Sequence, residues 1–283
     1  MAAVASETRR LTRREGTIAY DVSGDGPLVV CVPGMGELRS SYRRNVGSVG
    51  EAGYRVAAMD LRGHGDSDAT FGSYDDVAAG TDVLALIEEL EGPAVVVGSS
   101  MGAGAAAWAA AERPDLVAGV VLVGPFVRQA PINPLLAWAF RVAMSGPWAG
   151  AVWDRYLPSL YPGRRPPDFD QHRAAIRASM RRPGHGRAFR ATTRTSHAPV
   201  EARLPEVGAP ALVVMGTADP DFKDPRAESA WIVDQLPDAD ELLVDGAGHY
   251  PHTEQPEAVN PAVTAFVSRV LPPADEQGPQ PVP

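Results

Sequence analysis

Short apolar runs alternate with longer stretches of mixed polarity along most of this 283-residue chain. Apolar runs rich in valine and leucine are typical of strands that are buried on both faces, as in a parallel sheet. The runs that predict strands are 17–22, 28–32, 54–59, 94–97, 119–123, 211–215 and 241–244. Helix-length segments follow most of them, so the pattern predicts an α/β fold with a mostly parallel central sheet flanked by helices.

Periodicity of the apolar residues predicts individual helices. Residues 74–90 carry one apolar stripe (Val77, Leu84, Ile87, Leu90) and leave acidic residues outside it (Asp75, Asp82, Glu88, Glu89). Residues 256–271 predict a helix that closes the fold. The first two strands, 17–22 and 28–32, are expected to pair through the turn Gly24–Pro27.

Between the strands at 119–123 and 211–215 the strand–helix alternation stops for roughly 85 residues, too many for a structureless loop in a compact domain. Prolines divide this region into short helical stretches (Pro134, Pro147, Pro158, Pro166, Pro167, Pro183). We therefore expect residues 126–199 to form a separate helical unit, inserted into a core made of 1–125 and 200–271. Residues 272–283 are polar and rich in proline, which predicts a disordered tail.

The segment Gly98–Gly102 reads G-x-S-x-G and stands between the apolar run 94–97 and a stretch of small residues, 103–111. Strand, motif and helix in this order are typical of a nucleophile elbow. A serine on such a sharp turn has a strained backbone, so its neighbours must be glycine or very small. Ser100 is therefore the candidate nucleophile, while Ser99 fills a free position of the motif. The alternative is an ordinary serine at a helix N-cap.

An acid and a base follow the serine. Asp219 comes just after the run 211–215, and His249 lies in a glycine-rich loop after the run 241–244. The rivals for these roles are Asp221 and Asp224, which could cap a helix starting near Pro225, and His252. The order Ser, Asp, His is that of α/β-hydrolases and differs from the order in other serine hydrolase folds.

Two further segments support this assignment. The strand 28–32 runs into Pro33-Gly34-Met35-Gly36, and the segment Asp60–Ser67 reads D-L-R-G-H-G-D-S. From about residue 20 to 270 the chain resembles the α/β-hydrolase superfamily, whose members carry D-x-R-G-H-G-x-S at this place. The resemblance implies a helical cap over the nucleophile at 126–199 and a structural role for His64.

An oxyanion hole made of two backbone amides is expected in this superfamily. Members often have His-Gly before the first oxyanion residue, whereas this chain has Pro33 in place of that histidine. Proline has no amide proton to donate. The amides of Met35 and Met101 are therefore the expected pair.

Composition excludes several other classes of protein. Cys31 is the single cysteine and the histidines lack metal-ligand spacing, so neither a disulfide nor a metal site is expected. The Gly34–Arg39 segment follows a strand as in a dinucleotide fold, but Arg39 stands where the third glycine belongs. A net charge of −9 disfavours nucleic acid as a partner. No secretory signal or membrane-spanning run is recognised, so we expect a cytoplasmic protein with no membrane partner and no cofactor.

Charge is divided unevenly along the chain. Residues 126–203 hold 13 Arg against four acids, a balance of +9, which leaves −18 for the rest. Such a basic cap could attract an anionic substrate. The expected alternative is that its arginines pair with carboxylates of the core or are solvated. His172, His185 and His197 of this region are likewise expected to be solvated rather than catalytic.

These features predict a serine hydrolase that cleaves an ester or lactone of a small molecule with a hydrophobic part, through an acyl-enzyme. The same catalytic residues would also serve a carbon–carbon bond hydrolase or a cofactor-free perhydrolase. A receptor-like member with slow turnover is a third alternative. An aspartate nucleophile, as in epoxide hydrolases of the superfamily, is excluded by Ser100.

Overall fold

The protein is described from a computed structural model that covers residues 8–129 and 134–273. Its centre is an eight-stranded sheet in the order β1-β2-β4-β3-β5-β6-β7-β8. The strands are β1 (Thr8–Arg13), β2 (Gly16–Ser23), β3 (Leu28–Val32), β4 (Arg55–Met59), β5 (Ala94–Ser99), β6 (Val117–Val123), β7 (Ala211–Gly216) and β8 (Ala239–Val244). Strands β3 to β8 pair with one another in parallel. The predicted fold class is therefore confirmed.

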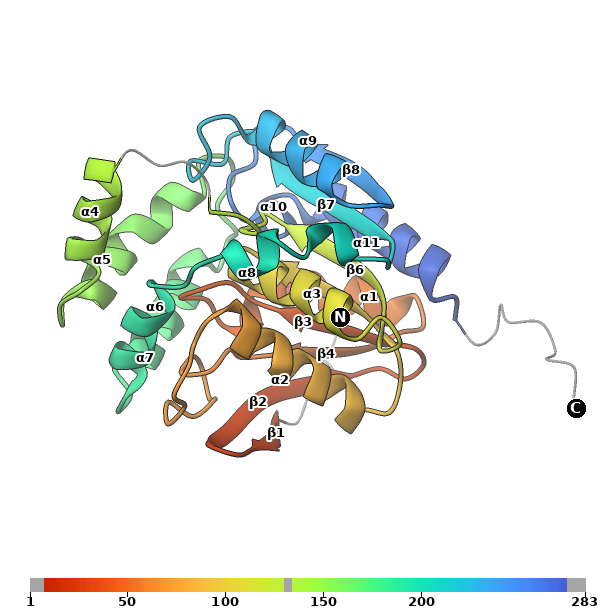
Figure 1. Cartoon of the computed structure of the whole chain (residues 1–283), viewed down its shortest axis with the longest axis horizontal. Helices are drawn as coiled ribbons and strands as arrows, with labels where there is room; N and C mark the ends of the chain where they lie inside the picture. The colour runs from red at the N-terminus through yellow and green to blue at the C-terminus, as the bar shows by residue number, and fades with distance from the viewer. Residues whose placement is uncertain (1–7, 130–133, 274–283) are drawn as a thin grey trace, which may run out of the picture.

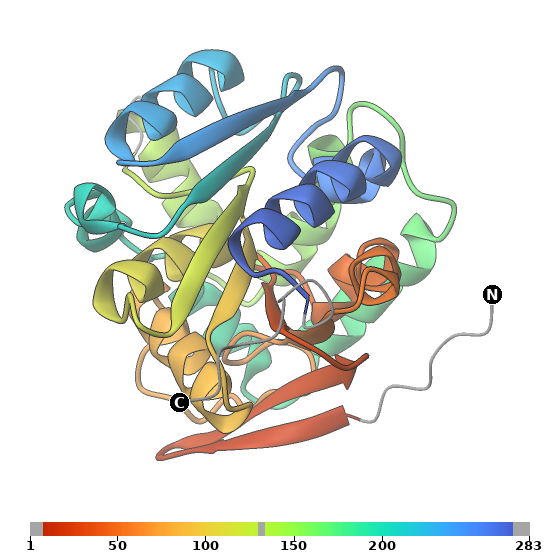
Figure 2. The same cartoon turned by 90° about the vertical axis from the view of Figure 1, so that its right-hand side faces the viewer.

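Helices cover both faces of the sheet. On one face lie α2 (Asp76–Glu89), α3 (Met101–Glu112) and α9 (Pro225–Gln235), which pack their apolar side chains on one set of strand residues. On the other face lie α1 (Val46–Glu51) and α11 (Pro256–Val270). Figure 2 shows these layers on opposite sides of the strands. The fully buried Val-rich strands β3 and β5 lie between them, as their continuous apolar sequence requires.

A series of helices is inserted between β6 and β7. They are α4 (Pro134–Ala143), α5 (Ala149–Tyr156), η2 (Leu157–Leu160), α6 (Phe169–Met180), α7 (His185–Thr192), α8 (Ala198–Glu201) and η3 (Leu204–Glu206). Helices α4 to α7 stand apart from the sheet at the left of Figure 1. Helices α5 to α7 share an apolar cluster with Leu38, which follows β3, and Tyr250, which follows β8. The inserted helices therefore rest on loops that leave the carboxyl ends of the strands.

Two expectations about the N-terminal half were wrong, and one strand was missed. Strands β2 and β3 do not pair, because β4 lies between them and is antiparallel to β2 and parallel to β3. Strand β1 was not predicted at all: it is an edge strand whose one buried side chain is Leu11. Asp82, placed outside the buried stripe of α2, is buried because Arg13 and Arg62 pair with it. The predicted disordered tail lies outside the described residues apart from Pro272 and Pro273.

The remaining short elements are η1 (Arg39–Arg44), which follows the loop after β3, and α10 (Pro251–Glu254), which follows the loop after β8. Asp60, at the end of β4, organises the segment that follows it. Its carboxylate accepts a hydrogen bond from the amide of Asp66 at 3.0 Å, and its carbonyl oxygen accepts one from Ser67 at 3.0 Å. The D-L-R-G-H-G-D-S segment thus forms a fixed loop.

Candidate active site

Ser100 occupies the turn between β5 and α3 and has a strained backbone. Its φ is 55° and its ψ is −122°, and Glu91 is the one other non-glycine residue with a positive φ in the described part of the chain. Such a conformation costs on the order of 1–3 kcal/mol and persists only where the surroundings enforce it. The Ser100 amide donates to Val123 of β6 at 2.8 Å, which ties the turn to the neighbouring strand.

The glycines of the motif are required by close backbone contacts. A Cβ on Gly98 would lie 2.2 Å from the carbonyl oxygen of Gly102, and a Cβ on Gly102 would lie 2.3 Å from that of Val32. A Cβ on Gly34 would lie 2.7 Å from Cβ of Ser100. A side chain at Gly34 or Gly102 would push the turn and the loop after β3 apart, and one at Gly98 would distort the turn itself. The G-x-S-x-G pattern is therefore a packing requirement of this turn.

Asp219 and His249 form a buried hydrogen-bonded pair. They follow β7 and β8, the last two strands of the sheet, and His249 Nδ1 lies 2.7 Å from Asp219 Oδ2. The second carboxylate oxygen of Asp219 accepts the amide of Asp221 at 3.0 Å. Both oxygens are thus engaged, which fixes the carboxylate and, through it, the imidazole ring.

Ser100 and His249 both lie next to the segment 124–126, but no hydrogen bond joins their side chains. The Phe126 amide donates to the Ser100 carbonyl at 3.3 Å, and the Phe126 ring centroid lies 5.5 Å from that of His249. A Cβ on Gly124 would lie 3.2 Å from His249 Nδ1. Among the described residues, no hydrogen bond reaches the Ser100 hydroxyl. Catalytic hydrogen bonds are often loose until substrate is bound.

A second carboxylate adds to the charge beside His249. Asp221 Oδ2 lies 3.7 Å from His249 Nδ1, and its other oxygen is bonded to the Tyr156 hydroxyl of α5. Burial disfavours the charged imidazole, but the Asp219 and Asp221 carboxylates outweigh it and raise the pKa of His249 to about 9. Asp224, the other rival acid, caps α9 by accepting from Ala227 at 3.1 Å.

Asp219, Asp221 and His249 also bring three potential metal-ligating atoms within 4.8 Å of one another. The hydrogen bond from His249 to Asp219 already uses the imidazole Nδ1. The other Asp219 oxygen accepts the Asp221 amide. Asp221 Oδ1 accepts the Tyr156 hydroxyl, so each of the three residues already has a hydrogen-bond partner.

The loop that carries Met35 is held from two sides. The amide of Gly36 donates to Nε2 of His64 at 3.0 Å, and Nδ1 of His64 donates to the Arg62 carbonyl at 2.9 Å. Burial lowers the pKa of His64 to about 4, so the neutral ring can accept this bond. From the inserted helices, Trp153 donates its indole N–H to the Gly36 carbonyl at 3.2 Å.

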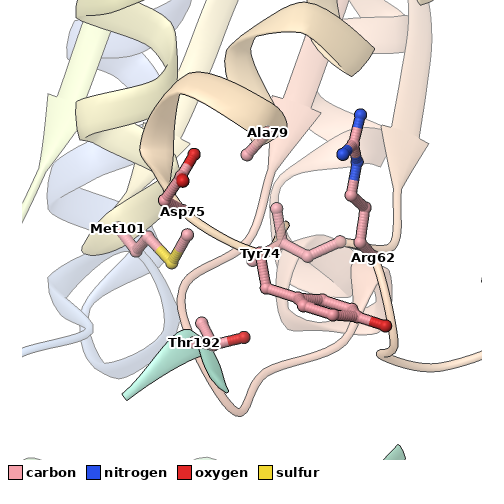
Figure 3. A pocket seen from close by; sticks show the side chains of 7 residues that line it. Arg62, Tyr74, Asp75, Ala79, Met101 and Thr192 are labelled. Atoms are coloured by element: carbon pink, nitrogen blue, oxygen red, sulfur yellow. The ribbon is translucent and has the colours of Figure 1, made fainter. Parts of the chain in front are cut away.

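Two cavities are found in the described part of the chain. The first, shown in Figure 3, has a volume of about 10 Å³ and is lined by the side chains of Met101, Tyr74 and Thr192, among others. This volume is about the smallest that can hold one water molecule. The second, of about 520 Å³, lies between α6 and the charged residues Arg39 and Asp66. Neither is lined by Ser100, Asp219 or His249.

The histidines of the inserted helices are not solvated, contrary to expectation. His172 Nε2 lies 2.7 Å from the buried Glu37 carboxylate, and His197 Nδ1 lies 2.7 Å from the buried Asp76 carboxylate. His185 is buried as well. These acids lie 135 and 121 residues away in the sequence, so no local pattern indicates the pairs.

His197 also stacks on Phe126, with ring centroids 5.7 Å apart and an interplanar angle of 22°. Phe126 thus lies next to both His197 and His249. His252, the rival of His249, is buried next to Tyr42 at 5.1 Å. Both of its ring nitrogens are without a hydrogen bond among the described residues, and burial lowers its pKa to about 3.

Comparison with known proteins identifies the family of this chain. The model of the alpha/beta hydrolase family matches residues 29–262, which include all three predicted catalytic residues. The chain belongs to this family. Among curated relatives, 2-(acetamidomethylene)succinate hydrolase of Mesorhizobium japonicum is 28% identical over 94% of this chain and 99% of its own length. The 3-oxoadipate enol-lactonase 2 of Acinetobacter baylyi is 27% identical over 92% of this hydrolase and 96% of its own length.

Among solved structures, a bromoperoxidase from Bacillus anthracis superimposes with a TM-score of 0.78 at 20% identity. The match covers 93% of this hydrolase and the whole of the bromoperoxidase chain (100%). At this level of identity the match shows a shared fold. The family and its curated relatives support a hydrolytic enzyme.

Proposed function

We propose that this hydrolase cleaves a carboxylic ester or lactone, with Ser100 as nucleophile, His249 as general base and Asp219 as the residue that orients His249. The observation that carries the proposal is the strained Ser100 at the end of β5, on the same sheet edge as the buried Asp219–His249 pair. Backbone strain of this kind lowers the stability of the fold, and a catalytic role would explain why it is kept. The relative named as an enol-lactonase supports the ester and lactone class.

In the proposed reaction, Ser100 Oγ attacks the carbonyl carbon while His249 Nε2 accepts the hydroxyl proton. Asp219 holds the Nδ1–H tautomer and stabilises the imidazolium that forms. His249 then returns the proton to the departing alcohol oxygen, and the acyl group remains on Ser100. A water molecule, deprotonated by His249, attacks the acyl-enzyme and releases the acid and the free serine.

The oxyanion formed at each step would be bound by the amides of Met35 and Met101. Met101 is the first residue of α3, and the first N–H groups of a helix have no partner within the helix. The loop carrying Met35 is fixed through Gly36 by His64 and Trp153. A donor held in this way contributes about 3 kcal/mol to stabilisation of the transition state.

The inserted helices would form a cap, residues 126–199, over Ser100. In support, Trp153 contacts the loop of Met35, and Tyr156 contacts Asp221 beside His249. Ser100 and His249 are both nearly inaccessible to solvent. A closed, apolar cover favours small substrates with a hydrophobic acyl or alcohol part over long triacylglycerols.

The proposal is tested with a series of p-nitrophenyl esters of increasing acyl length and a serine-directed phosphonate. We expect labelling at Ser100 and a fall in kcat of about a millionfold in Ser100→Ala. Ser99→Ala is the matched control, because the Ser99 hydroxyl is buried without a hydrogen bond in the described structure. This variant should keep its activity. Turnover of a diketone but of no ester would replace the proposal with a carbon–carbon hydrolase.

A further inference from the structure

An exposed apolar surface is confined to one part of the inserted helices. In the described chain, the large hydrophobic side chains exposed to solvent are Leu135, Trp138, Phe140, Val142 and Trp148. They all lie on α4 and on the turn that joins α4 to α5, at the left edge of the molecule in Figure 1. We call these five residues the α4 surface. Trp138 and Trp148 are the largest, with 62% and 55% of their surface exposed.

Exposed hydrophobic residues scattered singly are ordinary, but a cluster of this kind indicates an interaction site. The catalytic mechanism above uses none of these side chains. Two of the five are tryptophans, whose amphipathic rings favour the boundary between water and lipid headgroups. Helix α4 has ten residues and so a length of about 15 Å, which suits a helix lying along a surface. No helix among the described residues is long and apolar enough to span a bilayer.

The charge around this surface is cationic. From residue 127 to 153 the sequence contains no Asp or Glu, although the chain as a whole carries a net charge of −9. Arg141 of α4 is exposed and forms no ion pair within the described structure. The wider region 126–203 has a balance of +9, against −18 for the remainder, and pairs such as Arg128 with Glu228 cancel part of this difference. An anionic surface would therefore attract this side of the molecule and repel the rest.

From these observations we propose that the α4 surface docks on an anionic phospholipid membrane, with Trp138 and Trp148 inserted among the headgroups. The same charges disfavour a second copy of the chain as the occupant. A two-fold dimer would place the α4 surface of one copy against that of the other and bring two cationic regions together. Docking of this kind departs from the expectation of no membrane partner, which rested on the lack of a recognised membrane-spanning run.

Docking would be measured by co-flotation of the whole protein with vesicles. Equal mixtures of phosphatidylglycerol and phosphatidylcholine are compared with phosphatidylcholine alone, each at about 20 mM and about 500 mM NaCl. We expect binding to the anionic vesicles at low salt, weak binding to the neutral ones, and loss of binding at high salt. Arg141→Gln should lower the partition coefficient about fivefold. Trp138→Ser combined with Trp148→Ser should lower it about tenfold or more.

The matched charge control is Arg269→Gln, because Arg269 is exposed on α11, away from α4 in Figure 1. This variant should bind vesicles like the wild type. All these variants should keep the wild-type melting temperature and the wild-type rate on a water-soluble ester, so docking is tested independently of the proposed reaction. No binding to anionic vesicles at low salt would overturn the proposal. Equal binding to neutral vesicles would overturn its anionic part, and a dimer abolished by the tryptophan changes would identify a second copy as the occupant.

Discussion

At the residue scale, His249 lies between two opposing effects. Burial removes water from the imidazolium and lowers its stability, whereas Asp219 at 2.7 Å and Asp221 at 3.7 Å stabilise it. The carboxylates prevail, and the pKa of His249 rises to about 9. A general base must be unprotonated to accept the serine proton. A raised pKa would therefore shift the activity of the proposed base toward higher pH.

This balance predicts a pH profile. We expect kcat/KM for a neutral ester to rise with pH until about pH 9, where half of His249 is neutral. Asp221→Asn removes one of the charges that raise the pKa, so the acidic limb should move to lower pH with a modest change in the maximal rate. Asp219→Asn should move the same limb but also lower kcat by about 10⁴-fold, because the imidazole loses the partner that fixes its tautomer. Identical profiles for the wild type and Asp221→Asn would contradict this account.

The two neighbouring histidines should behave differently. His249→Ala is expected to be nearly as damaging to kcat as Ser100→Ala, since members of a catalytic set act as a unit. His252→Ala should keep kcat close to the wild-type value. Because His252 is buried, its truncation leaves a cavity and should lower the free energy of unfolding by about 2 kcal/mol. Urea unfolding measures the second effect separately from the first, and the opposite pattern of activity would move the base to His252.

At the element scale, the turn between β5 and α3 is built on backbone contacts that leave no room for a Cβ. Gly102→Ala would place a methyl group 2.3 Å from the carbonyl of Val32 and 2.6 Å from that of Pro33, next to the loop of Met35. We expect a loss of about 3 kcal/mol in stability together with a large fall in kcat. The control is Gly47→Ala in α1, where a Cβ meets nothing within 4 Å. It should be neutral or stabilise the protein by about 0.5 kcal/mol.

A second prediction at this scale concerns the attachment of the inserted helices. His197 Nδ1 is hydrogen-bonded to the buried Asp76 carboxylate, whose other oxygen has no hydrogen bond among the described residues. His197→Ala would leave a buried carboxylate without its partner, which we expect to cost about 3 kcal/mol of unfolding free energy. Arg113→Ala, which breaks exposed pairs with Glu88 and Asp115, should change stability by less than about 1 kcal/mol. Equal losses in the two variants would show that the His197–Asp76 pair is not a significant contact.

The sequence predicted those features that depend on neighbouring residues and missed those that depend on contacts between distant segments. Ser100 directly follows β5, and Asp219 and His249 lie in the loops that follow β7 and β8. The apolar runs that predict the strands therefore also indicated the candidate residues. Strand β1 has three arginines and one buried residue, and an edge strand of this composition gives no apolar run. The pairs of His172 with Glu37 and His197 with Asp76 depend on the folding of distant segments, which no local pattern records.

At the scale of the whole molecule, the separation of charge is partly cancelled where the inserted helices meet the core. Arg128 pairs with Glu228, Arg164 with Glu257, and Arg182 with Asp66. Each pair joins the basic region to a carboxylate of the acidic remainder. These arginines serve contacts between the two parts of the chain and are already engaged before any substrate binds. The unpaired cations lie elsewhere, as Arg141 does on α4.

The last prediction follows from this division of roles. If paired arginines do not recognise substrate, kcat/KM for an anionic ester and for its neutral analogue should respond equally to added salt. The measurement compares the two esters between about 20 mM and 500 mM NaCl, a range over which screening shortens from about 20 Å to about 4 Å. Vesicle binding by the α4 surface should decline over the same range, since it depends on unpaired charge facing outward. A steep fall for the anionic ester alone would instead place an unpaired arginine of the inserted helices in the substrate site, and changing each of these arginines to glutamine would then identify it.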